Sequence, residues 1–409
     1  MKKLLIVVSL LGLLGTACST LSPDEEVLGN LRIDPSVTRN NWHQEQNLVY
    51  SFSGGLETLF PYHIVKKGPV STPLPQAEHP MVFWYTFDGN RYNSDEYLAR
   101  QRVTGLLVVK DGQIVLERYQ YGRNKLNRFL SKSMAKSVTS LLVGIAIAEG
   151  HIKSIDDLAK QYVPKLAGHP YGETSIRHLL QMSSGVEFIE LNAGSRIRDV
   201  DTLERESWLS QGYGGVSTVM PFKKNNRIYE PGTKFQYSSA ETQVLGLVLR
   251  QAIGKSLSDY LSEKIWQPMG AESDATWFID RSGQEPAYNC INATVRDFAR
   301  LGIMLANDGV ANGKQIVPNE WIREATRPTP GYPHLKPHVA TPYMGYGYQF
   351  WVFPGINRRF ALEGSYGQRI YVDPKLKLVM VQTAVDDNPK LSHECDALWR
   401  SIVATYGHW

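Results

Sequence analysis

The stretch from Ser131 to Ala148 constrains the fold more than any other part of the sequence. Its second part, Val138–Ala148, is apolar almost throughout, is long enough for a helix, and is followed by Glu149 and Gly150. Glycine is typical of the position just past a helix end. Because a helix that is apolar on all sides lies inside a core, the sequence predicts a buried helix that begins at or near Ser133.

Ser133 and Lys136 lie three residues apart, so this helix would place their side chains on one face. A serine hydroxyl attacks once a base takes its proton, and a lysine whose pKa is lowered by burial can be that base. The N-terminus of the helix would also stabilise an oxyanion. The alternative is a capping serine beside a solvated lysine, which these residues alone favour. The surroundings must therefore decide.

Composition narrows the possible classes of protein. The chain has 409 residues, of which 42% are hydrophobic, which is enough for one large domain or two subdomains. The net charge is +4 and no basic block is long enough to suggest nucleic-acid binding. The histidines lack metal-ligand spacing, so we predict no metal site. Apart from Cys18, the cysteines are Cys290 and Cys395, which either pair or stay as free buried thiols.

The first residues predict export. Met1–Lys3 is basic, and Leu4–Leu14 is apolar but too short to span a bilayer. Small residues at 15–17 then precede Cys18, which resembles a bacterial lipobox, although Gly15 stands where leucine is usual. We expect residues 1–17 to be a signal peptide and Cys18 to be lipidated. Ordinary cleavage after Ala17 is the alternative.

A lipidated Cys18 would make the mature protein a lipoprotein on the periplasmic side of a Gram-negative bacterium. Its membrane partner, outer or inner, would be contacted through the lipid anchor; Ser19 resembles the outer-membrane sorting pattern. Without lipidation, the protein would be soluble in the periplasm.

The remaining chain divides into an N-terminal segment and one larger domain. Residues 18–100 are interrupted by prolines and predict a tether and an irregular segment packed on the domain at residues 101–409. In that domain, strands are expected near both ends and helices in the middle, and a long polar loop at 187–227 is expected beside the site. The strands are Thr104–Lys110, Gln113–Tyr119, Met344–Val352, Gln368–Pro374, Leu376–Gln382 and a short one ending in Tyr237; the helices are Glu241–Gly254, Ser256–Trp266, Ala293–Leu305 and Cys395–Ala404. A surface helix and a loop are expected within Ser154–Leu166.

Beyond Ser133–Ser137, further stretches occur in an order that is known from one superfamily. They are Ile176–Leu180 with Ser184-Gly185, Pro231-Gly232-Thr233 leading to Tyr237-x-Ser239, Ala293–Asp297, Gly345–Tyr348, and Gly364–Gln368 before Val372-Asp373-Pro374. On these stretches, the chain from about Leu106 to the C-terminus resembles the class C β-lactamase-like serine hydrolases, and some details are similar to the 6-aminohexanoate-dimer hydrolase branch, which contains amide and ester hydrolases. A merely structural Ser133 is then no longer the favoured interpretation.

The resemblance implies an α+β fold of the β-lactamase and penicillin-binding-protein type, with an antiparallel sheet flanked by helices and a mostly helical subdomain. It implies that Ser133 is acylated, that Lys136 activates it, and that Tyr237 relays a proton to the leaving group. We expect Lys136 to lower the pKa of Tyr237. The backbone N–H groups of Ser133 and Ser365 would form the oxyanion hole. Ser239, Tyr213 and Tyr366 are weaker candidates for substrate contacts, and no cofactor is implied.

Two departures from the superfamily bear on the substrate. The motif Tyr-x-Asn ends in Ser239, and the usual Lys-Thr-Gly triplet is replaced by Leu362-Glu363-Gly364. The triplet's lysine helps β-lactamases and D-alanyl peptidases to bind a substrate carboxylate, so we expect poor activity of both kinds. Arg369 or Lys234 would be the substitute cation.

We therefore expect an exported serine hydrolase that cleaves a small ester or amide through an acyl-enzyme. A D,D-peptidase or β-lactamase is the alternative enzyme. A non-catalytic cell-wall or ligand-binding module of the same fold is the alternative from another class, against which the joint presence of Ser133, Lys136 and Tyr237 argues.

Overall fold

A seven-stranded antiparallel sheet forms the backbone of the structure, a computed structural model that describes residues 36–190, 198–386 and 392–409. Its strand order, β11-β12-β13-β14-β15-β4-β5, joins strands from both ends of the large domain. The junction is the pairing of β15 with β4, in which Val381 lies opposite Leu107. The strands are β4 Val103–Lys110, β5 Gln113–Tyr119, β11 Gly345–Tyr346, β12 Trp351–Val352, β13 Phe360–Gly364, β14 Gln368–Asp373 and β15 Leu378–Ala384.

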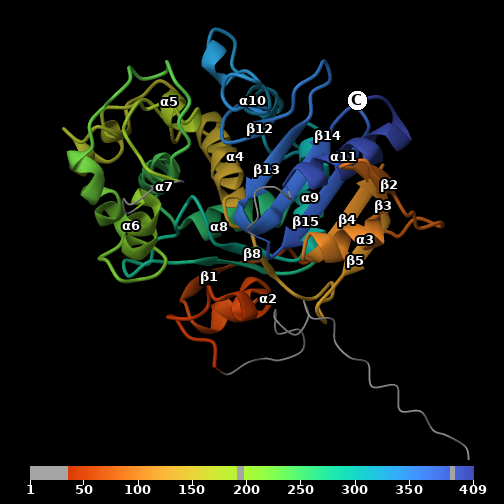
Figure 1. Cartoon of the computed structure of the whole chain (residues 1–409). Coiled ribbons are helices and arrows are strands. Elements are labelled where there is room, and N and C mark those ends of the chain that lie inside the picture. Colours follow the sequence, from red (N-terminus) through yellow and green to blue (C-terminus); the bar gives the residue numbers. More distant parts are fainter. Residues whose placement is uncertain (1–35, 191–197, 387–391) are drawn as a thin grey trace, which may run out of the picture.

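Helices cover both faces of this sheet (Figure 1). Helices α4 (Met134–Ala148) and α9 (Val295–Ala306) pack on one face, and α3 (Ser94–Arg100) and α11 (Ser392–Tyr406) lie on the other. A hydrophobic core lies on each face of the sheet, because side chains alternate along β4. Leu107 belongs to the core under α4 and α9, and Leu106 belongs to the core under α3 and α11. The α+β class expected from the sequence is confirmed.

The middle of the chain forms the helical part, shown in yellow and green in Figure 1. A surface helix and a loop were expected within Ser154–Leu166, and the helix is wrong, because only 3-10 turns form there, at Ala159–Gln161 and Pro164–Leu166. The helices of this part are α5 Ile176–Leu180, α6 Asp199–Glu206, α7 Ser239–Ile253 and α8 Leu257–Leu261, which continues into a π-turn at Ser262–Trp266; α10 Asn319–Ala325 packs against α4, and further 3-10 turns lie at Gly215–Thr218, Met220–Lys224 and Pro333–Leu335.

A smaller sheet connects the N-terminal segment to the rest of the chain. Its order is β1-β7-β8-β6, with β1 at Tyr62–Val65, β6 at Phe129–Leu130, β7 at Ala275–Phe278 and β8 at Ile291–Ala293. The N-terminal segment also contains the 3-10 turns Glu45–Asn47 and Gly55–Thr58, helix α2 Leu48–Phe52 and the hairpin β2 Trp84–Phe87 and β3 Asn90–Asn93; a second small hairpin consists of β9 Val310–Ala311 and β10 Lys314–Gln315. Strand β6 leads directly into Ser131, so this sheet supports the start of α4. The domain boundary predicted at residue 100 stays a prediction.

Helix α4 agrees with its sequence prediction. Ser133 is its N-cap residue, Met134 begins it, and Gly150 follows its end with a φ of +76°. Its side chains from Met134 to Ala146 are buried, as expected for a helix that is apolar on all sides.

The segment Met344–Val352 differs from the single strand that the sequence predicted. It forms two short strands, β11 and β12, separated by a loop in which Gln349 is left-handed with a φ of +64°. The reason is a tertiary contact, because the backbone and side-chain N–H groups of Gln349 donate to carbonyl oxygens of Leu179 and Leu180 at 3.0 Å. The short strand expected to end in Tyr237 is also wrong, since that residue lies in a loop.

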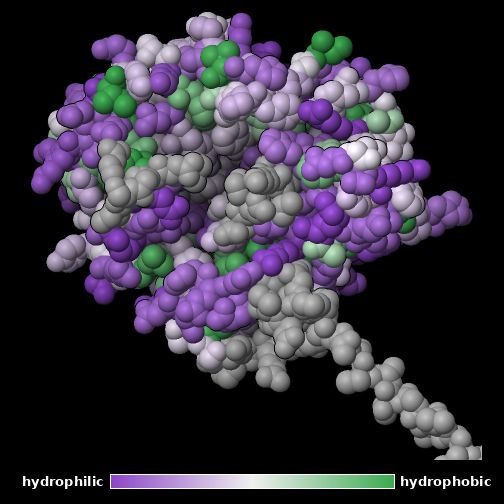
Figure 2. Space-filling model, viewed as in Figure 1, coloured by the Kyte–Doolittle hydropathy of each residue, from purple (hydrophilic) through white to green (hydrophobic). Residues whose placement is uncertain are grey.

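The surface is mostly hydrophilic on the face shown in Figure 2, with hydrophobic residues scattered among polar ones. Large exposed hydrophobic side chains include Val70, Leu126 and Ile356. Within the described ranges, no helix is both long and apolar enough to cross a membrane.

Close packing of α4 on α10 gives a test of the fold. A Cβ added to Gly144 would lie 2.4 Å from the ring of Trp321. We therefore expect Gly144→Ala to lower the free energy of unfolding by about 1–3 kcal/mol, because overpacking outweighs the gain in helix propensity of about 1 kcal/mol. Urea unfolding measures this, and the double variant with Trp321→Leu should recover part of the loss. A net gain in stability from Gly144→Ala alone would contradict this packing.

Candidate active site

Ser133 and Lys136 meet at the start of α4, as their spacing predicted. The Nζ atom of Lys136 donates a hydrogen bond to Oγ of Ser133 at 2.9 Å. Lys136 also donates to the carbonyl oxygen of Tyr288 at 3.2 Å. Two acceptors thus hold the amine against the hydroxyl, which is the contact that a base needs in order to take a serine proton.

The burial of Lys136 changes its acidity. Only 1% of the residue is exposed, and its Nζ lies 5.0 Å from the ring centre of Tyr237 and 5.3 Å from that of Tyr288. Loss of hydration lowers the pKa of Lys136 to about 8, while the carboxylates of Glu190 and Glu204 act in the opposite direction. A substantial fraction of Lys136 is therefore a neutral amine near pH 8 and is able to accept a proton.

Tyr237 lies beside this pair and is held by other aromatic rings. It stacks on Trp351 with ring centres 5.5 Å apart, and Tyr346 approaches edge-on at 6.3 Å. The surrounding protein raises the pKa of Tyr237, Glu190 raises it further, and a hydrogen bond with Ser133 lowers it by less. The expectation that Lys136 would lower this pKa is therefore wrong, since desolvation dominates. Tyr237 is a neutral phenol at neutral pH and hence a proton donor.

Glu190 is a member of the site that sequence reasoning missed. Its carboxylate accepts hydrogen bonds from the backbone N–H of Ser239 at 2.8 Å and from Oγ of Ser239 at 2.6 Å. Ser239 begins α7, so the acid also sits at a helix N-terminus, where negative charge is favourable. No local pattern in the polar stretch after Gly185 distinguishes Glu190, because its partner is far away in the sequence.

The C-terminal end of strand β13 lies directly against the start of α4. At Gly364, the last residue of β13, an added Cβ would lie 2.5 Å from the carbonyl oxygen of Ser131 and 3.0 Å from the backbone N of Ser133. Only glycine permits this approach. Ser365 directly follows Gly364 in the chain. The oxyanion hole that the resemblance implied, formed by the backbone N–H groups of Ser133 and Ser365, stays a prediction.

The residues that replace the usual Lys-Thr-Gly triplet supply no free cation. Leu362 is fully buried in the core shared with α4. Glu363 accepts a hydrogen bond from the Tyr371 hydroxyl at 3.0 Å, and burial raises the pKa of the Glu363 carboxyl. Arg369 is buried and lies opposite Glu363 in the register of β13 and β14, whereas Lys234 donates to the Tyr229 hydroxyl at 2.8 Å.

The other stretches that resemble the superfamily brace the loop that carries Tyr237. Gly232 adopts a φ of +77° and lies so close to His178 that an added Cβ would be 2.5 Å from its ring. Its backbone N–H donates to the carbonyl oxygen of Ser183 at 2.8 Å. Likewise, Gly185 (φ +74°) packs on the backbone of Tyr229. These residues are supports for the loop and not reacting groups.

The stretch Ala293–Asp297 also has a structural role, at the start of helix α9. Thr294 caps helix α9 through the N–H of Asp297 at 3.1 Å. The Asp297 carboxylate accepts hydrogen bonds from the N–H groups of Glu272 and Ser273 at 2.8 and 3.1 Å.

The weaker sequence candidates for substrate contacts, Tyr213 and Tyr366, have surroundings that do not assign them a role. Tyr213 is 84% exposed, and no contact within the described residues links it to Ser133, Lys136 or Tyr237. Tyr366 turns its ring toward Phe52, with ring centres 4.9 Å apart. Substrate contacts of both tyrosines stay predictions.

The cysteines have separate outcomes. Cys290 and Cys395 are free and buried in different cores, so the possibility that they pair is wrong. Cys18 lies outside the described residues.

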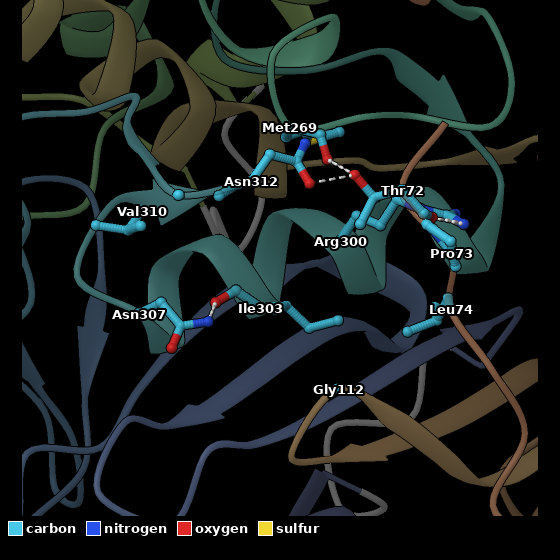
Figure 3. A pocket seen from close by; sticks show the side chains of 12 residues that line it. Thr72, Pro73, Leu74, Gly112, Met269, Arg300, Ile303, Asn307, Val310 and Asn312 are labelled. Atoms are coloured by element: carbon cyan, nitrogen blue, oxygen red, sulfur yellow. Dashed lines mark hydrogen bonds between the residues drawn. The ribbon is translucent and has the colours of Figure 1, made fainter. Parts of the chain in front are cut away.

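A pocket of about 380 Å³ lies elsewhere, between residues 72–74 and helix α9 (Figure 3). Its polar groups bind one another, since Arg300 donates through Nε and Nη2 to the carbonyl oxygen of Thr72 at 3.0 and 2.9 Å, and the Thr72 hydroxyl lies 2.8 Å from Asn312. None of its lining residues belongs to the Ser133 site. These bonds fix the loop at residues 72–74 against α9.

Comparisons with known proteins show the family of the chain. A model of the family described as beta-lactamase matches residues 93–404. The 6-aminohexanoate-dimer hydrolase of Paenarthrobacter ureafaciens is 26% identical over 365 residues, which cover 87% of this chain and 90% of that protein.

Solved structures give the same result. A structure from Bacillus anthracis described as a putative 6-aminohexanoate-dimer hydrolase superposes with a TM-score of 0.81 at 26% identity, and the match covers 91% of this chain and 97% of that one. The octameric penicillin-binding protein homologue from Pyrococcus abyssi shares the fold, with a TM-score of 0.56 at 20% identity over 77% and 76% of the two chains. The chain therefore belongs to the beta-lactamase family of serine hydrolases, in the branch similar to 6-aminohexanoate-dimer hydrolases.

Proposed function

We propose that this protein is an exported serine hydrolase that cleaves an ester or amide through an acyl-enzyme on Ser133. The observation that carries the proposal is the 2.9 Å hydrogen bond between Ser133 and Lys136, whose buried amine has its pKa lowered to about 8. A lysine in that state accepts a proton near neutral pH, unlike a solvated one. The family supports a hydrolase in general, and the geometry of these residues supports this particular chemistry.

In the first half-reaction, neutral Lys136 takes the proton of Ser133 as Oγ attacks the substrate carbonyl. The new C–O bond converts the carbonyl oxygen into an oxyanion, which the N–H groups of Ser133 and Ser365 would stabilise. Collapse of this intermediate breaks the bond to the leaving amine or alcohol, which needs a proton. Tyr237 gives its phenolic proton to the leaving group and regains one from the Lys136 ammonium.

In the second half-reaction, water replaces the leaving group. Lys136 or the Tyr237–Lys136 pair takes a proton from water as its oxygen attacks the ester carbonyl of acyl-Ser133. The C–Oγ bond then breaks, and the serine regains its proton from the ammonium. Each residue thus ends in its starting protonation state, and this route draws only on side chains and backbone groups of the chain.

The replaced triplet argues against a substrate that is held by its carboxylate. Buried Leu362 supplies no charge, and Glu363 is an acid. We therefore expect esters or linear amides to be better substrates than β-lactams or D-alanyl peptides.

Export and lipidation form a second part of the proposal, supported by the basic, apolar and small residues that precede Cys18. We expect the mature protein to begin at a lipidated Cys18 and to partition with membranes, and Cys18→Ser to abolish this partition. Mass spectrometry of the N-terminal peptide from the native host tests this. An unmodified N-terminus at Cys18 would instead indicate ordinary signal cleavage.

Hydrolysis of a short-chain p-nitrophenyl ester tests the catalytic pair. We expect Ser133→Ala and Lys136→Ala to lower kcat/KM by about 10³-fold or more, since each removes a group that reacts. Ser140→Ala is the matched control, because it lies on the same helix and its hydroxyl has no hydrogen-bond partner among the described residues.

The same assay distinguishes substrate classes when nitrocefin and the linear dimer of 6-aminohexanoate are run in parallel. Fast cleavage of nitrocefin would overturn our interpretation of Leu362-Glu363-Gly364. Failure of every substrate, together with no labelling of Ser133 by a fluorophosphonate, would instead favour a binding module.

The pH dependence follows from the pKa of Lys136. Activity needs the neutral amine, so we expect kcat/KM for a neutral ester to rise about tenfold per pH unit below pH 8 and to level off above it. Because the negative charge of Glu190 raises the pKa of Lys136, Glu190→Gln should move this acidic limb to lower pH. Glu320→Gln, at an exposed position, is the control. A limb that stays in place would show that Glu190 does not act on the catalytic base.

A further inference from the structure

The side chain of Lys132, the residue just before Ser133, lies in a cage of aromatic rings. Only 5% of Lys132 is exposed. No carboxylate in the described part of the chain lies within salt-bridge distance of its amine. The ring centres that surround its Nζ belong to Trp42 at 5.2 Å, Phe52 at 4.9 Å, Trp208 at 5.6 Å and Tyr366 at 5.5 Å.

The rings come from segments that are far apart in the sequence. Trp42 and Phe52 belong to the N-terminal segment, Trp208 follows α6, and Tyr366 follows β13. They also pack on one another, since the ring centres of Trp42 and Trp208 are 5.3 Å apart and those of Phe52 and Tyr366 are 4.9 Å apart. A cation enclosed by aromatic faces is attracted to each of them, and more strongly where water is excluded.

Lys132 and Tyr366 also have unusual backbone conformations. Lys132 has a φ of +47° and Tyr366 a φ of +64°, both in the left-handed region that residues with a Cβ rarely adopt. Such conformations persist only when the surroundings hold them. Lys132 directly precedes Ser133 and forms the peptide that carries the Ser133 N–H, and Tyr366 directly follows Ser365.

The contact between Lys132 and Tyr366 therefore links the two segments that carry the oxyanion-hole donors, the turn before α4 and the residues after β13. The same two segments touch at Gly364, where an added Cβ would lie 2.8 Å from Cβ of Lys132 and 3.0 Å from the N of Ser133. On the other side, Ser131 donates from its N–H to the carbonyl oxygen of Ile291 at 2.7 Å. Three contacts thus hold the segment before Ser133: the hydrogen bond to β8, the close approach of β13, and the aromatic cage around Lys132.

We propose that Lys132 is a positioning residue whose caged ammonium aligns the N–H groups of Ser133 and Ser365 for the oxyanion, and that the N-terminal residues Trp42 and Phe52 complete this support. The inference rests on the proposed acyl-enzyme function. The family match begins only at residue 93, so half of the cage lies outside the matched region. The N-terminal segment is accordingly a functional part of the active site and not only a tether.

The test compares Lys132→Met with Lys132→Arg in the full protein. Methionine keeps the length and apolar character of the side chain but removes its charge, whereas arginine keeps the cation. For a p-nitrophenyl ester, we expect Lys132→Met to lower kcat about 10- to 100-fold with KM changed less than about threefold, and Lys132→Arg to recover part of kcat.

Inhibition by a phenylboronic acid gives a second readout. Its tetrahedral adduct with Ser133 places an oxygen in the oxyanion hole, so its Ki should rise in proportion to the loss of kcat/KM. A residue with a merely structural role would change thermal stability without this proportionality.

Control variants keep the test decisive. Lys110→Met removes another lysine that lies over a ring, that of Tyr406 at 5.6 Å, at the far end of β4, and should leave kcat unchanged. Phe52→Leu removes one ring of the cage and should reproduce the effect of Lys132→Met in weaker form, even if the latter variant folds poorly.

The outcomes separate this inference from the proposed function. Wild-type kcat and boronate affinity in Lys132→Met, with Ser133→Ala inactive, would overturn the role of the cage and leave the serine hydrolase intact. An inactive wild-type protein whose Ser133 is not labelled by a fluorophosphonate would overturn both.

Discussion

The buried amine of Lys136 is the group on which the rest of the site depends. A charged ammonium loses its hydration when it is enclosed, so burial favours the neutral amine that the chemistry needs. The fold achieves this by placing Lys136 on the first turn of a helix buried on all sides, α4, with Tyr288 and Tyr237 over the amine. Helices α7 and α10 and strands β13 and β14 pack against α4, which explains why its sequence is so apolar.

Close backbone contacts join these parts at Ser133. Gly364 brings the end of β13 against the turn before α4, and the left-handed residues Lys132 and Tyr366 stand just before Ser133 and just after Ser365. Strained conformations of this kind gather where function requires a fixed geometry. Here the strained backbone of Lys132 is held in place by the aromatic rings around its side chain, including rings of the N-terminal segment.

The sequence predicted what local patterns determine. The apolar run of α4, the strands at Thr104–Lys110 and Gln113–Tyr119 and the helix at Ala293–Leu305 were all recognisable, because hydrophobic periodicity and capping act over a few residues. Glu190, the cage of Lys132 and the break at Gln349 were not, because each depends on partners far away in the chain. The acidity of Tyr237 was misjudged for the same reason, since a neighbouring lysine was visible and the desolvation was not.

The opposite pKa shifts of Lys136 and Tyr237 determine how protons can move between them. Burial lowers the pKa of Lys136 to about 8 and raises that of Tyr237, so a tyrosinate beside an ammonium is strongly disfavoured. Stepwise transfer from Tyr237 to the leaving group would create that state. The tyrosine can therefore relay a proton only if it receives one from Lys136 as it gives its own away. Such a concerted relay requires the short distances that the caged and buried groups around Ser133 maintain.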